Sequence, residues 1–319
     1  MKITVLGCGR WGTFIAWYLN KIGHQITLYG RDGSAHMQEL IQSRCNGLVS
    51  LNEQIVLSTS IASVSNADTL VISIHSQGLQ DLMQQLAKMN IQGKTIVLCM
   101  KGLEISTGRR LSQIAADTLA SSNPVAVWLG PGHVQEFVKG IPNCMVIDSL
   151  HEQTKKALVD AFSSDLIRFY YGQDLIGNEI GAAAKNVIGI AAGMLDGLKL
   201  TTLKGALMSR GTREIARLIA AIGGNERSAY GLCHLGDYEA TVFSVFSHNR
   251  KFGESFVLSQ PYTELAEGYF AVRALVQMGA RYNVDLPICN AVCNVLYNGS
   301  DAKATLDHLF SRSLKSEFS

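Results

Sequence analysis

Lys185 is the residue of this chain best suited by its surroundings to acid–base chemistry. It stands in a very apolar segment, with Gly181 and three alanines before it and Asn186 and Val187 after it. The small residues leave room for a ligand, and Asn186 adds a polar group at the same level of a helix. A partly desolvated lysine loses basicity, which suits proton transfer near neutral pH. The alternative is a lysine at the helix edge whose ammonium group reaches water.

Further polar residues follow apolar runs at intervals along the chain. Lys101–Glu104 comes after one buried strand-like run and Gly130–His133 after the next. Loops that leave the carboxyl ends of parallel strands form the usual ligand crevice of such sheets. Asp237 with Thr241, and then Ser247–Gly253, add polar groups later in the chain. Each group alone is a weak signal, and their order and spacing carry the argument.

A glycine-rich turn follows the first strand-like run. Gly7-Cys8-Gly9-Arg10-Trp11-Gly12 has the spacing of a dinucleotide-binding fingerprint, and a helical pattern follows it. Gly7 permits the tight turn, Gly9 lets the backbone approach a pyrophosphate, and Gly12 lets the helix pack closely on the strand. The helix N-terminus offers unpaired N–H groups and positive partial charge to the phosphates. The turn therefore indicates binding of NAD or NADP.

The end of the second predicted strand bears on the choice of cofactor. Gly30-Arg31-Asp32 follows Gln25–Tyr29, where an acidic residue would hold the ribose hydroxyls of NAD. Arg31 comes first instead, and an arginine can bind a 2′-phosphate and stack on adenine. This favours NADP over NAD. The alternative is a solvated Arg31 with Asp32 as the ribose ligand.

The elements that must position these residues differ between the two halves of the chain. The first half alternates buried strands with amphipathic helices, which indicates a parallel sheet covered on both faces. The expected strands are Ile3–Leu6, Gln25–Tyr29, Thr69–Ile74, Thr95–Met100, Ala126–Leu129 and Leu166–Tyr170, with helices Thr13–Ile22 and Leu79–Lys88. In the second half apolar residues recur at helical spacing, most clearly over Ile180–Leu195, Leu207–Ile222 and Leu265–Met278. We expect a Rossmann-type doubly wound α/β domain over 1–174 and an all-helical substrate-binding domain over 175–319.

Composition limits the class of protein. A chain of 319 residues with 47% hydrophobic and 17% charged residues suits two packed domains and excludes global disorder. A net charge of +2 gives no reason to expect a nucleic-acid partner. The N-terminal apolar run is too short for a signal peptide, and no run has the length of a membrane span. The seven cysteines are scattered without a Cys-x-x-Cys pair, so we expect reduced thiols in the cytoplasm and no metal site.

Across nearly its whole length the sequence resembles the bacterial-type NAD(P)-dependent glycerol-3-phosphate dehydrogenases. The Gly181–Val187 segment is similar to the family's catalytic motif and is the most specific match. The other matching segments are Gly7–Thr13, Lys101–Glu104, Gly130–Glu136, Asn249–Gly253 and Glu267–Tyr269.

The resemblance implies a Rossmann domain, a helical substrate domain, a cleft between them and a homodimer. It implies interconversion of dihydroxyacetone phosphate and sn-glycerol 3-phosphate for phospholipid synthesis. Lys185 would be the proton donor or acceptor, oriented and held protonated by Asp237. The expected substrate-binding residues are Lys101, Gly130, Gly132, Lys185, Asp237, Thr241, Ser247, His248 and Asn249, with Arg250 as a further phosphate partner. The expected cofactor-binding residues are Gly7, Gly9, Arg10, Trp11, Gly12, Arg31, Lys101, Val134, His248, Leu265 and Glu267.

The chain departs from the family pattern at several positions. His248 stands where the family usually has arginine, Tyr238 where it has leucine, and His75-Ser76 where it has Pro-Ser. The loop around Asn46 is shorter than usual. These departures leave open a related dehydrogenase acting on another small keto or hydroxy acid, such as a ketopantoate-like compound, since one fold hosts several chemistries. A non-catalytic dinucleotide sensor is a further alternative, although it would not need Lys185, Lys101 and Asp237 together.

Overall fold

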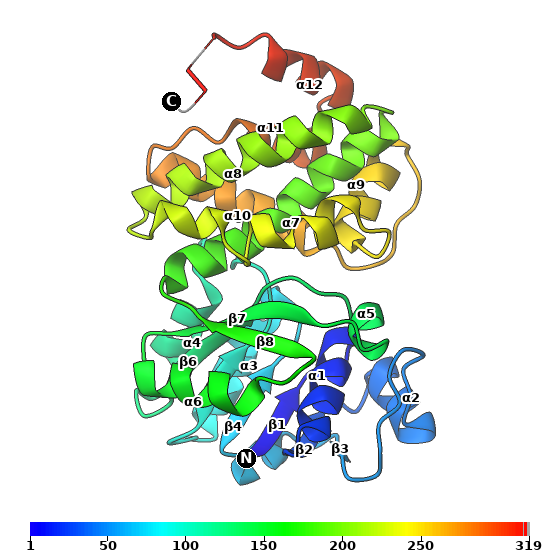
Figure 1. Ribbon diagram of the computed structural model, residues 1–319, viewed down its shortest axis with the longest axis vertical. Coiled ribbons are helices and arrows are strands. Elements are labelled where there is room, and N and C mark those ends of the chain that lie inside the picture. The colour runs from blue at the N-terminus through cyan, green and yellow to red at the C-terminus, as the bar shows by residue number, and fades with distance from the viewer. Residues whose placement is uncertain (315, 318–319) are drawn as a thin grey trace. The chain divides into compact units, whose positions relative to one another are not determined.

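The computed structural model describes residues 1–314, 316 and 317. By their packing these residues form two compact units, one of residues 1–100 and 111–173 and the other of residues 101–110 with the chain from Asp174 onward (Figure 1). The segment Lys101–Arg110 therefore packs with the second unit, whereas its place in the sequence put it with the first domain.

The first unit is built on one eight-stranded sheet with the order β3-β2-β1-β4-β5-β6-β7-β8. Every neighbouring pair is parallel except β6 and β7, which are antiparallel. The chain starts at β1 in the interior of the sheet and extends it in both directions, which is the doubly wound arrangement. The predicted Rossmann-type α/β class is thus confirmed. The strands are β1 (Lys2–Leu6), β2 (Gln25–Tyr29), β3 (Val56–Ser58), β4 (Thr69–Ile72), β5 (Thr95–Leu98), β6 (Val125–Leu129), β7 (Asn143–Ser149) and β8 (Ile167–Tyr171).

Helices cover this sheet and complete its core. Fully buried aromatic side chains, among them Phe14, Trp128 and Phe162, pack with the aliphatic residues of the strands. Burial of such large apolar side chains is the main favourable term in folding. The helices are α1 (Arg10–Lys21), α2 (Ala35–Ser43), α3 (Leu79–Lys88), α4 (Leu111–Thr118), α5 (Val134–Val138) and α6 (Glu152–Phe162), with short 3₁₀ segments at Ile61–Asn66 and Ser76–Gly78.

The second unit is helical, as the sequence predicted for the C-terminal half, and is organised around α7 (Leu175–Gly197). Nearly every residue of α7 is buried, because α8, α9, α10 and α11 all pack against it. This explains why its sequence is apolar on all sides. The other helices are α8 (Lys204–Ala221), α9 (His248–Val257), α10 (Glu267–Arg281), α11 (Pro287–Asn298) and α12 (Ala302–Phe310), which packs on α11.

Short turns between α8 and α9 carry polar residues toward α7. They comprise 3₁₀ segments at Glu226–Tyr230 and Leu235–Asp237 and a π-helical turn at Glu239–Phe243, and a further 3₁₀ segment at Thr201–Leu203 connects α7 to α8. Such π turns are rare and occur often at functional sites. Over the described ranges of the chain, no helix is long and apolar enough to cross a membrane.

Candidate active site

Lys185 lies in the middle of α7, and its side chain is directed into the second unit rather than to water. The residue is only 8% exposed. Its Nζ donates to Thr241 Oγ1 at 2.8 Å and forms an ion pair with Asp237 Oδ2 at 3.1 Å. A lysine at a helix edge would keep its ammonium group in water, so that alternative is wrong.

Asp237 is the anion that compensates this buried charge. It ends the 3₁₀ segment Leu235–Asp237 and is 1% exposed. Its Oδ2 also accepts a hydrogen bond from Lys101 Nζ at 2.7 Å. The Thr241 hydroxyl donates to the main-chain oxygen of Asp237 at 2.7 Å, so its own oxygen is left to accept from Lys185. Two cations therefore share one carboxylate oxygen.

The surroundings of Lys185 weaken its hold on a proton. Burial lowers its pKa to about 8, Asp237 opposes that change, and the neighbouring charge of Lys101 lowers the pKa further. Burial disfavours the charged form of any amine, whereas a nearby carboxylate favours it. The result is an amine that can exchange a proton close to neutral pH.

A chain of amides fixes the segments around this lysine. Asn249 Nδ2 donates to Asn186 Oδ1 at 3.1 Å, and Asn186 Nδ2 donates to the main-chain oxygen of Lys101 at 3.0 Å. The N–H of Gly268 donates to Asn249 Oδ1 at 2.9 Å. The 101–110 segment, α7, α9 and α10 are thus joined at the level of Lys185. Asn186 was noted in the sequence but not assigned to the site; its position next to Lys185 was the signal.

The start of α9 holds other predicted residues, among them Arg250. The Arg250 guanidinium donates to Asp196 Oδ2 at 2.8 Å, to Glu254 Oε2 at 3.0 Å and to the main-chain oxygen of Ser244 at 3.1 Å. These contacts use Nε and Nη1 and fix Arg250 between α7 and α9, and its expected role as a phosphate partner stays a prediction. Ser247 caps α9, its hydroxyl oxygen accepting from the N–H of Arg250 at 3.3 Å.

The remaining expected residues of the second unit lie near the ends of α9 and α10. His248 is the first residue of α9 and is half-buried, and its Nδ1 lies 3.0 Å from the Tyr262 hydroxyl. Glu267 is the first residue of α10. Leu265 precedes that helix and is 49% exposed.

In the first unit the glycine fingerprint forms the turn from β1 into α1. Gly7 has φ +113°, and a Cβ there would lie 2.1 Å from the main-chain oxygen of Ser73. A Cβ on Gly12 would lie 1.9 Å from the oxygen of Gly7. Only glycine is accommodated at either position. Around Gly9, by contrast, nothing in the described chain comes within 4 Å of such an atom.

This turn presents the N-terminus of α1 in a form suited to an anion. Gly9 is the N-cap residue and supplies no side-chain cap, and the first turn contains no acidic residue. The first N–H groups of a helix have no partner within it and carry positive partial charge. The open space at Gly9 and these donors fit the pyrophosphate of a dinucleotide. Arg10 is the first residue of the helix and is exposed.

Other expected cofactor residues occupy several parts of the first unit. Arg31 is exposed just beyond the end of β2. Trp11 packs into an aromatic cluster, with its ring centroid 5.1 Å from that of Phe14 and 6.2 Å from that of Phe137. The side chain of Val134 is 3% exposed and belongs to the core at the start of α5. Gly130 and Gly132 lie in the loop between β6 and α5.

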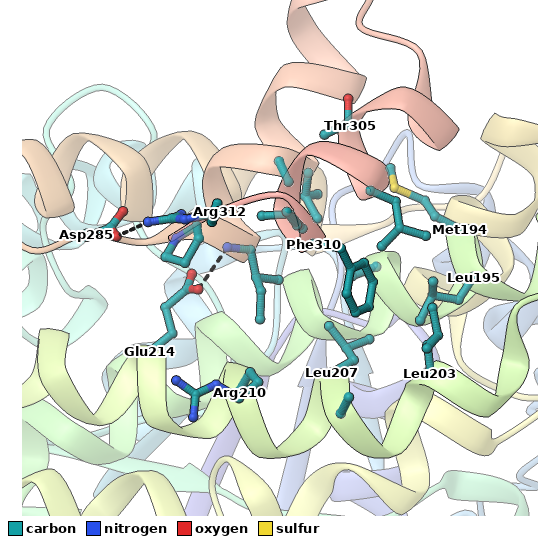
Figure 2. Close-up of a pocket in the computed structure, with 18 of the residues that line it drawn as sticks. Met194, Leu195, Leu203, Leu207, Arg210, Glu214, Asp285, Thr305, Phe310 and Arg312 are labelled. Carbon is teal, nitrogen blue, oxygen red and sulfur yellow. Dashed lines mark hydrogen bonds and ion pairs between the residues drawn. The ribbon is translucent and has the colours of Figure 1, made fainter. Parts of the chain in front are cut away.

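A separate cavity of about 650 Å³ lies in the second unit, lined by residues of α7, α8, α11, α12 and the segment after α12. Figure 2 shows Met194, Leu207 and Phe310 on one side of it and Glu214, Asp285 and Arg312 on the other. Arg312 is ion-paired with Asp285. None of the residues grouped around Lys185 lines this cavity, so it is distinct from the candidate active site.

A dinucleotide-binding sheet and a buried lysine paired with an aspartate define a nicotinamide-dependent dehydrogenase. Residues 2–155 match the family described as the NAD-dependent glycerol-3-phosphate dehydrogenase N-terminus, and residues 174–307 match that of its C-terminus. The chain belongs to the family of NAD(P)-dependent glycerol-3-phosphate dehydrogenases, and its cofactor is NAD or NADP.

Individual relatives agree with this assignment over the whole chain. The glycerol-3-phosphate dehydrogenase [NAD(P)+] of Thermoanaerobacter sp. is 33% identical over 329 residues, covering 99% of both chains. That of Janthinobacterium sp. is 35% identical over 333 residues, again covering 99% of both. The crystal structure of glycerol-3-phosphate dehydrogenase from Coxiella burnetii matches with a TM-score of 0.91 at 26% identity, covering 98% of this chain and 99% of that one.

Proposed function

We propose that this enzyme interconverts dihydroxyacetone phosphate and sn-glycerol 3-phosphate, with Lys185 giving the proton in reduction and taking it back in oxidation. The observation that carries the proposal is the buried contact of Lys185 with Thr241 and Asp237, beside a second lysine, at 2.8 and 3.1 Å. The names of the relatives support the choice of substrate.

Lys185 has the donors that reduction of a ketone requires. An ammonium group has three N–H donors, and contacts with Thr241 and Asp237 use two of them. The third can donate to a ketone oxygen. NADH or NADPH, when bound, supplies the hydride that adds to the ketone carbon. The ammonium group stabilises the negative charge that develops on the oxygen and then transfers its proton to it.

The charge balance around Lys185 favours an anionic substrate. Lys185 and Lys101 carry two positive charges when both are protonated, and Asp237 supplies one negative charge. The side chain of Lys101 is 21% exposed, so it can also reach a polar group of the ligand. Asn249 and Thr241 would complete the substrate contacts, with Ser247, His248, Gly130 and Gly132 as further expected contacts.

For the cofactor we assign the pyrophosphate to the turn of Gly7, Gly9 and Gly12 and to the N-terminus of α1. Arg31 would bind the 2′-phosphate of NADP, which its exposure beyond β2 permits. The family resemblance adds further contacts at Arg10, Trp11, Lys101, Val134, His248, Leu265 and Glu267. For Val134 the burial of the side chain leaves the main chain as the contacting group.

We further place the enzyme in the cytoplasm as a homodimer that supplies phospholipid synthesis. The seven cysteines are scattered without a Cys-x-x-Cys pair, which favours reduced thiols and a reducing compartment. The assembly and the metabolic role rest on the family resemblance alone.

Oxidation of NADH and of NADPH with dihydroxyacetone phosphate tests the proposal, measured beside ketopantoate and other small keto acids. We expect turnover with dihydroxyacetone phosphate and at least tenfold lower kcat/KM with the others. Turnover of another ketone only would assign the enzyme to a different substrate. Cofactor binding without turnover of any ketone would identify a dinucleotide sensor.

A further inference from the structure

His234 and Tyr238 are two fully buried polar side chains. In the sequence they lie on either side of Asp237, the ion-pair partner of Lys185. Both are 0% exposed. His234 Nδ1 lies 2.9 Å from the main-chain oxygen of Gly181, and its Nε2 lies 2.8 Å from the Tyr238 hydroxyl. Tyr238 is also one of the positions at which the sequence departs from the pattern of the family that it resembles.

The hydrogen bonds fix which imidazole nitrogen carries the proton. A carbonyl oxygen can only accept, so Nδ1 must carry the hydrogen and Nε2 must accept from the tyrosine. Burial lowers the pKa of His234 to about 4, so the imidazole is neutral at physiological pH. A neutral histidine with one assigned tautomer and two satisfied nitrogens is a rigid connection between its neighbours.

This connection joins the turn that carries Asp237 to the helix that carries Lys185. Asp237 lies between His234 and Tyr238 in the sequence, and His234 binds the carbonyl of Gly181. That carbonyl lies one helical turn before Lys185 and on the same face of α7. A Cβ on Gly181 would lie 2.9 Å from Cβ of His234, so glycine permits the close approach. Tyr238 reaches α8 as well, where Thr212 Oγ1 lies 3.4 Å from its hydroxyl.

We propose that His234 and Tyr238 are positioning residues that hold the Asp237 carboxylate against Lys185 and so keep the lysine charged for proton transfer. Neither touches the reacting atoms in this arrangement; each acts through Asp237. The proposal rests on the function of Lys185 proposed above. Removal of the Tyr238 hydroxyl should loosen the turn and weaken the contact between the carboxylate and Lys185.

The charged and titratable groups that face Lys185 determine the direction of the effect. Asp237 favours the ammonium form, Lys101 disfavours it, and His234 lies behind them as a neutral group. From α9 and α10 the residues at this level are Asn249 and Gly268, and neither titrates. A looser Asp237 must therefore shift the titration of Lys185 to lower pH.

The test follows the ionisation of Lys185 without any substrate. In protein labelled with ¹³C at the lysine Cε, the Lys185 signal is assigned by its loss in Lys185→Met and titrated between pH 6 and 10. In Tyr238→Phe we expect the titration midpoint of Lys185 to fall by about half a pH unit or more. The free energy of the lost hydrogen bond is similar to that of a one-unit change in pKa, and part of it should appear in the pKa of Lys185. His234→Asn keeps a donor for Gly181 but does not reach Tyr238, so it should shift the midpoint equally.

Controls separate positioning from general loss of packing. Tyr18→Phe removes the hydroxyl of another fully buried tyrosine, which donates to the main-chain oxygen of Phe162 in the first unit. It should lower the Tm without moving the Lys185 midpoint. The double variant Tyr238→Phe/His234→Asn should shift the midpoint no further than either single change, because both remove the same bond.

The outcomes distinguish this inference from the proposed reaction. A lower Tm with an unchanged Lys185 midpoint in Tyr238→Phe would show that the pair is structural only and would overturn the inference. If the midpoint shifts but the wild type does not reduce dihydroxyacetone phosphate, the positioning stands and the substrate assignment fails. Where turnover is observed, the alkaline limb of kcat should move with the NMR midpoint while KM for the cofactor stays unchanged.

Discussion

Lys101 and Lys185 contact the same carboxylate oxygen of Asp237, with N–O distances of 2.7 and 3.1 Å. One negative charge therefore serves two lysines, and the pKa of Lys185 falls through burial and the charge of Lys101 more than Asp237 restores it. Breaking a buried ion pair by removing one partner leaves uncompensated charge. The enzyme's pH response should depend on this one aspartate.

Asp237→Asn should move the titration of Lys185 to lower pH, because it removes the charge that favours the ammonium form. Above the midpoint, each pH unit by which the titration of Lys185 moves down lowers its protonated fraction about tenfold. We expect the rate of ketone reduction at pH 8 to fall at least tenfold. In the pH–rate profile, the decline on the alkaline side should begin at a lower pH. Asp196→Asn is the matched control, since Asp196 also binds two cations, Lys204 at 2.7 Å and Arg250 at 2.8 Å. It should lower the Tm and leave the alkaline decline in place; equal pH profiles for the two variants would contradict the role of Asp237.

Lys185→Met should abolish turnover and leave cofactor binding nearly unchanged. General acid catalysis contributes roughly 10²–10⁴-fold, and loss of charge stabilisation adds to this. Steady-state rates and cofactor fluorescence titrations measure the two effects separately. Lys204→Met removes another buried lysine, which is paired with Asp196 at 2.7 Å, and should reduce stability while retaining turnover. If Lys185→Met keeps more than about a tenth of the wild-type rate, Lys185 is structural.

The parts of the site that the sequence predicted are those with local signatures. The spacing of Gly7, Gly9 and Gly12 predicted the turn because the steric demands arise within a strand, a turn and a helix. Apolar residues around Lys185 predicted its burial for the same reason. The pairing of Arg250 with Asp196, 54 positions earlier, depends on how α7 and α9 pack, and a charged loop gave no sign of it.

Strand β7 was missed for a related physical reason. Asn143–Ser149 has polar residues at both ends, and it joins the sheet antiparallel to β6 in an otherwise parallel arrangement. Pairing in the sheet, not local propensity, makes it a strand. The hydrogen bond between His234 and Tyr238 was likewise not predicted from the sequence, where Tyr238 was noted only as a departure from the family pattern.

Arg31→Ala should raise KM for NADPH by roughly tenfold or more and change KM for NADH little. A charge-assisted contact with the 2′-phosphate is worth about 1.5–3 kcal/mol. Initial rates with each cofactor measure the effect. Asp32→Ala is the companion variant, because this neighbouring exposed carboxylate would hold the ribose hydroxyls of NAD. A rise in KM for NADH with Asp32→Ala, and equal small effects of Arg31→Ala on both cofactors, would assign the enzyme to NAD.

His248→Arg should tighten binding of the phosphorylated ligands at pH 8. The Tyr262 hydroxyl donates to the main-chain oxygen of His248 at 3.0 Å, so Nδ1 is left to donate to the tyrosine oxygen. Nε2 of a neutral ring is then an acceptor, and only the imidazolium can donate to a phosphate. Arginine at this position would instead carry a permanent charge and two donors suited to a phosphate. Wild-type KM values for His248→Arg at pH 8 would place residue 248 outside the anion site.

Glu214 should make the stability of the protein fall as pH rises toward neutrality. Its carboxyl group is buried at the edge of the cavity of Figure 2. Its two oxygens accept from the N–H groups of Ile288 at 2.8 Å and Cys289 at 2.9 Å, at the start of α11. Burial raises its pKa from 4.5 to about 7 despite these hydrogen bonds. Between those values the folded protein holds a proton that the unfolded chain has released. Stability from this group is therefore complete below pH 4.5 and is lost as pH rises through 7.

Glu214→Gln removes this titration while keeping one acceptor oxygen for the helix. The free energy of unfolding of the variant, from urea denaturation at pH 5 to 8, should fall less steeply than that of the wild type. One proton accounts for a difference of at most about 1.4 kcal/mol per pH unit. Glu226→Gln is the control, because its carboxylate is 54% exposed and paired with Arg213 at 3.3 Å. It should leave the slope unchanged. Parallel slopes for Glu214→Gln and the wild type would show that Glu214 is already ionised in the folded protein at pH 5, with the N-terminus of α11 compensating its charge.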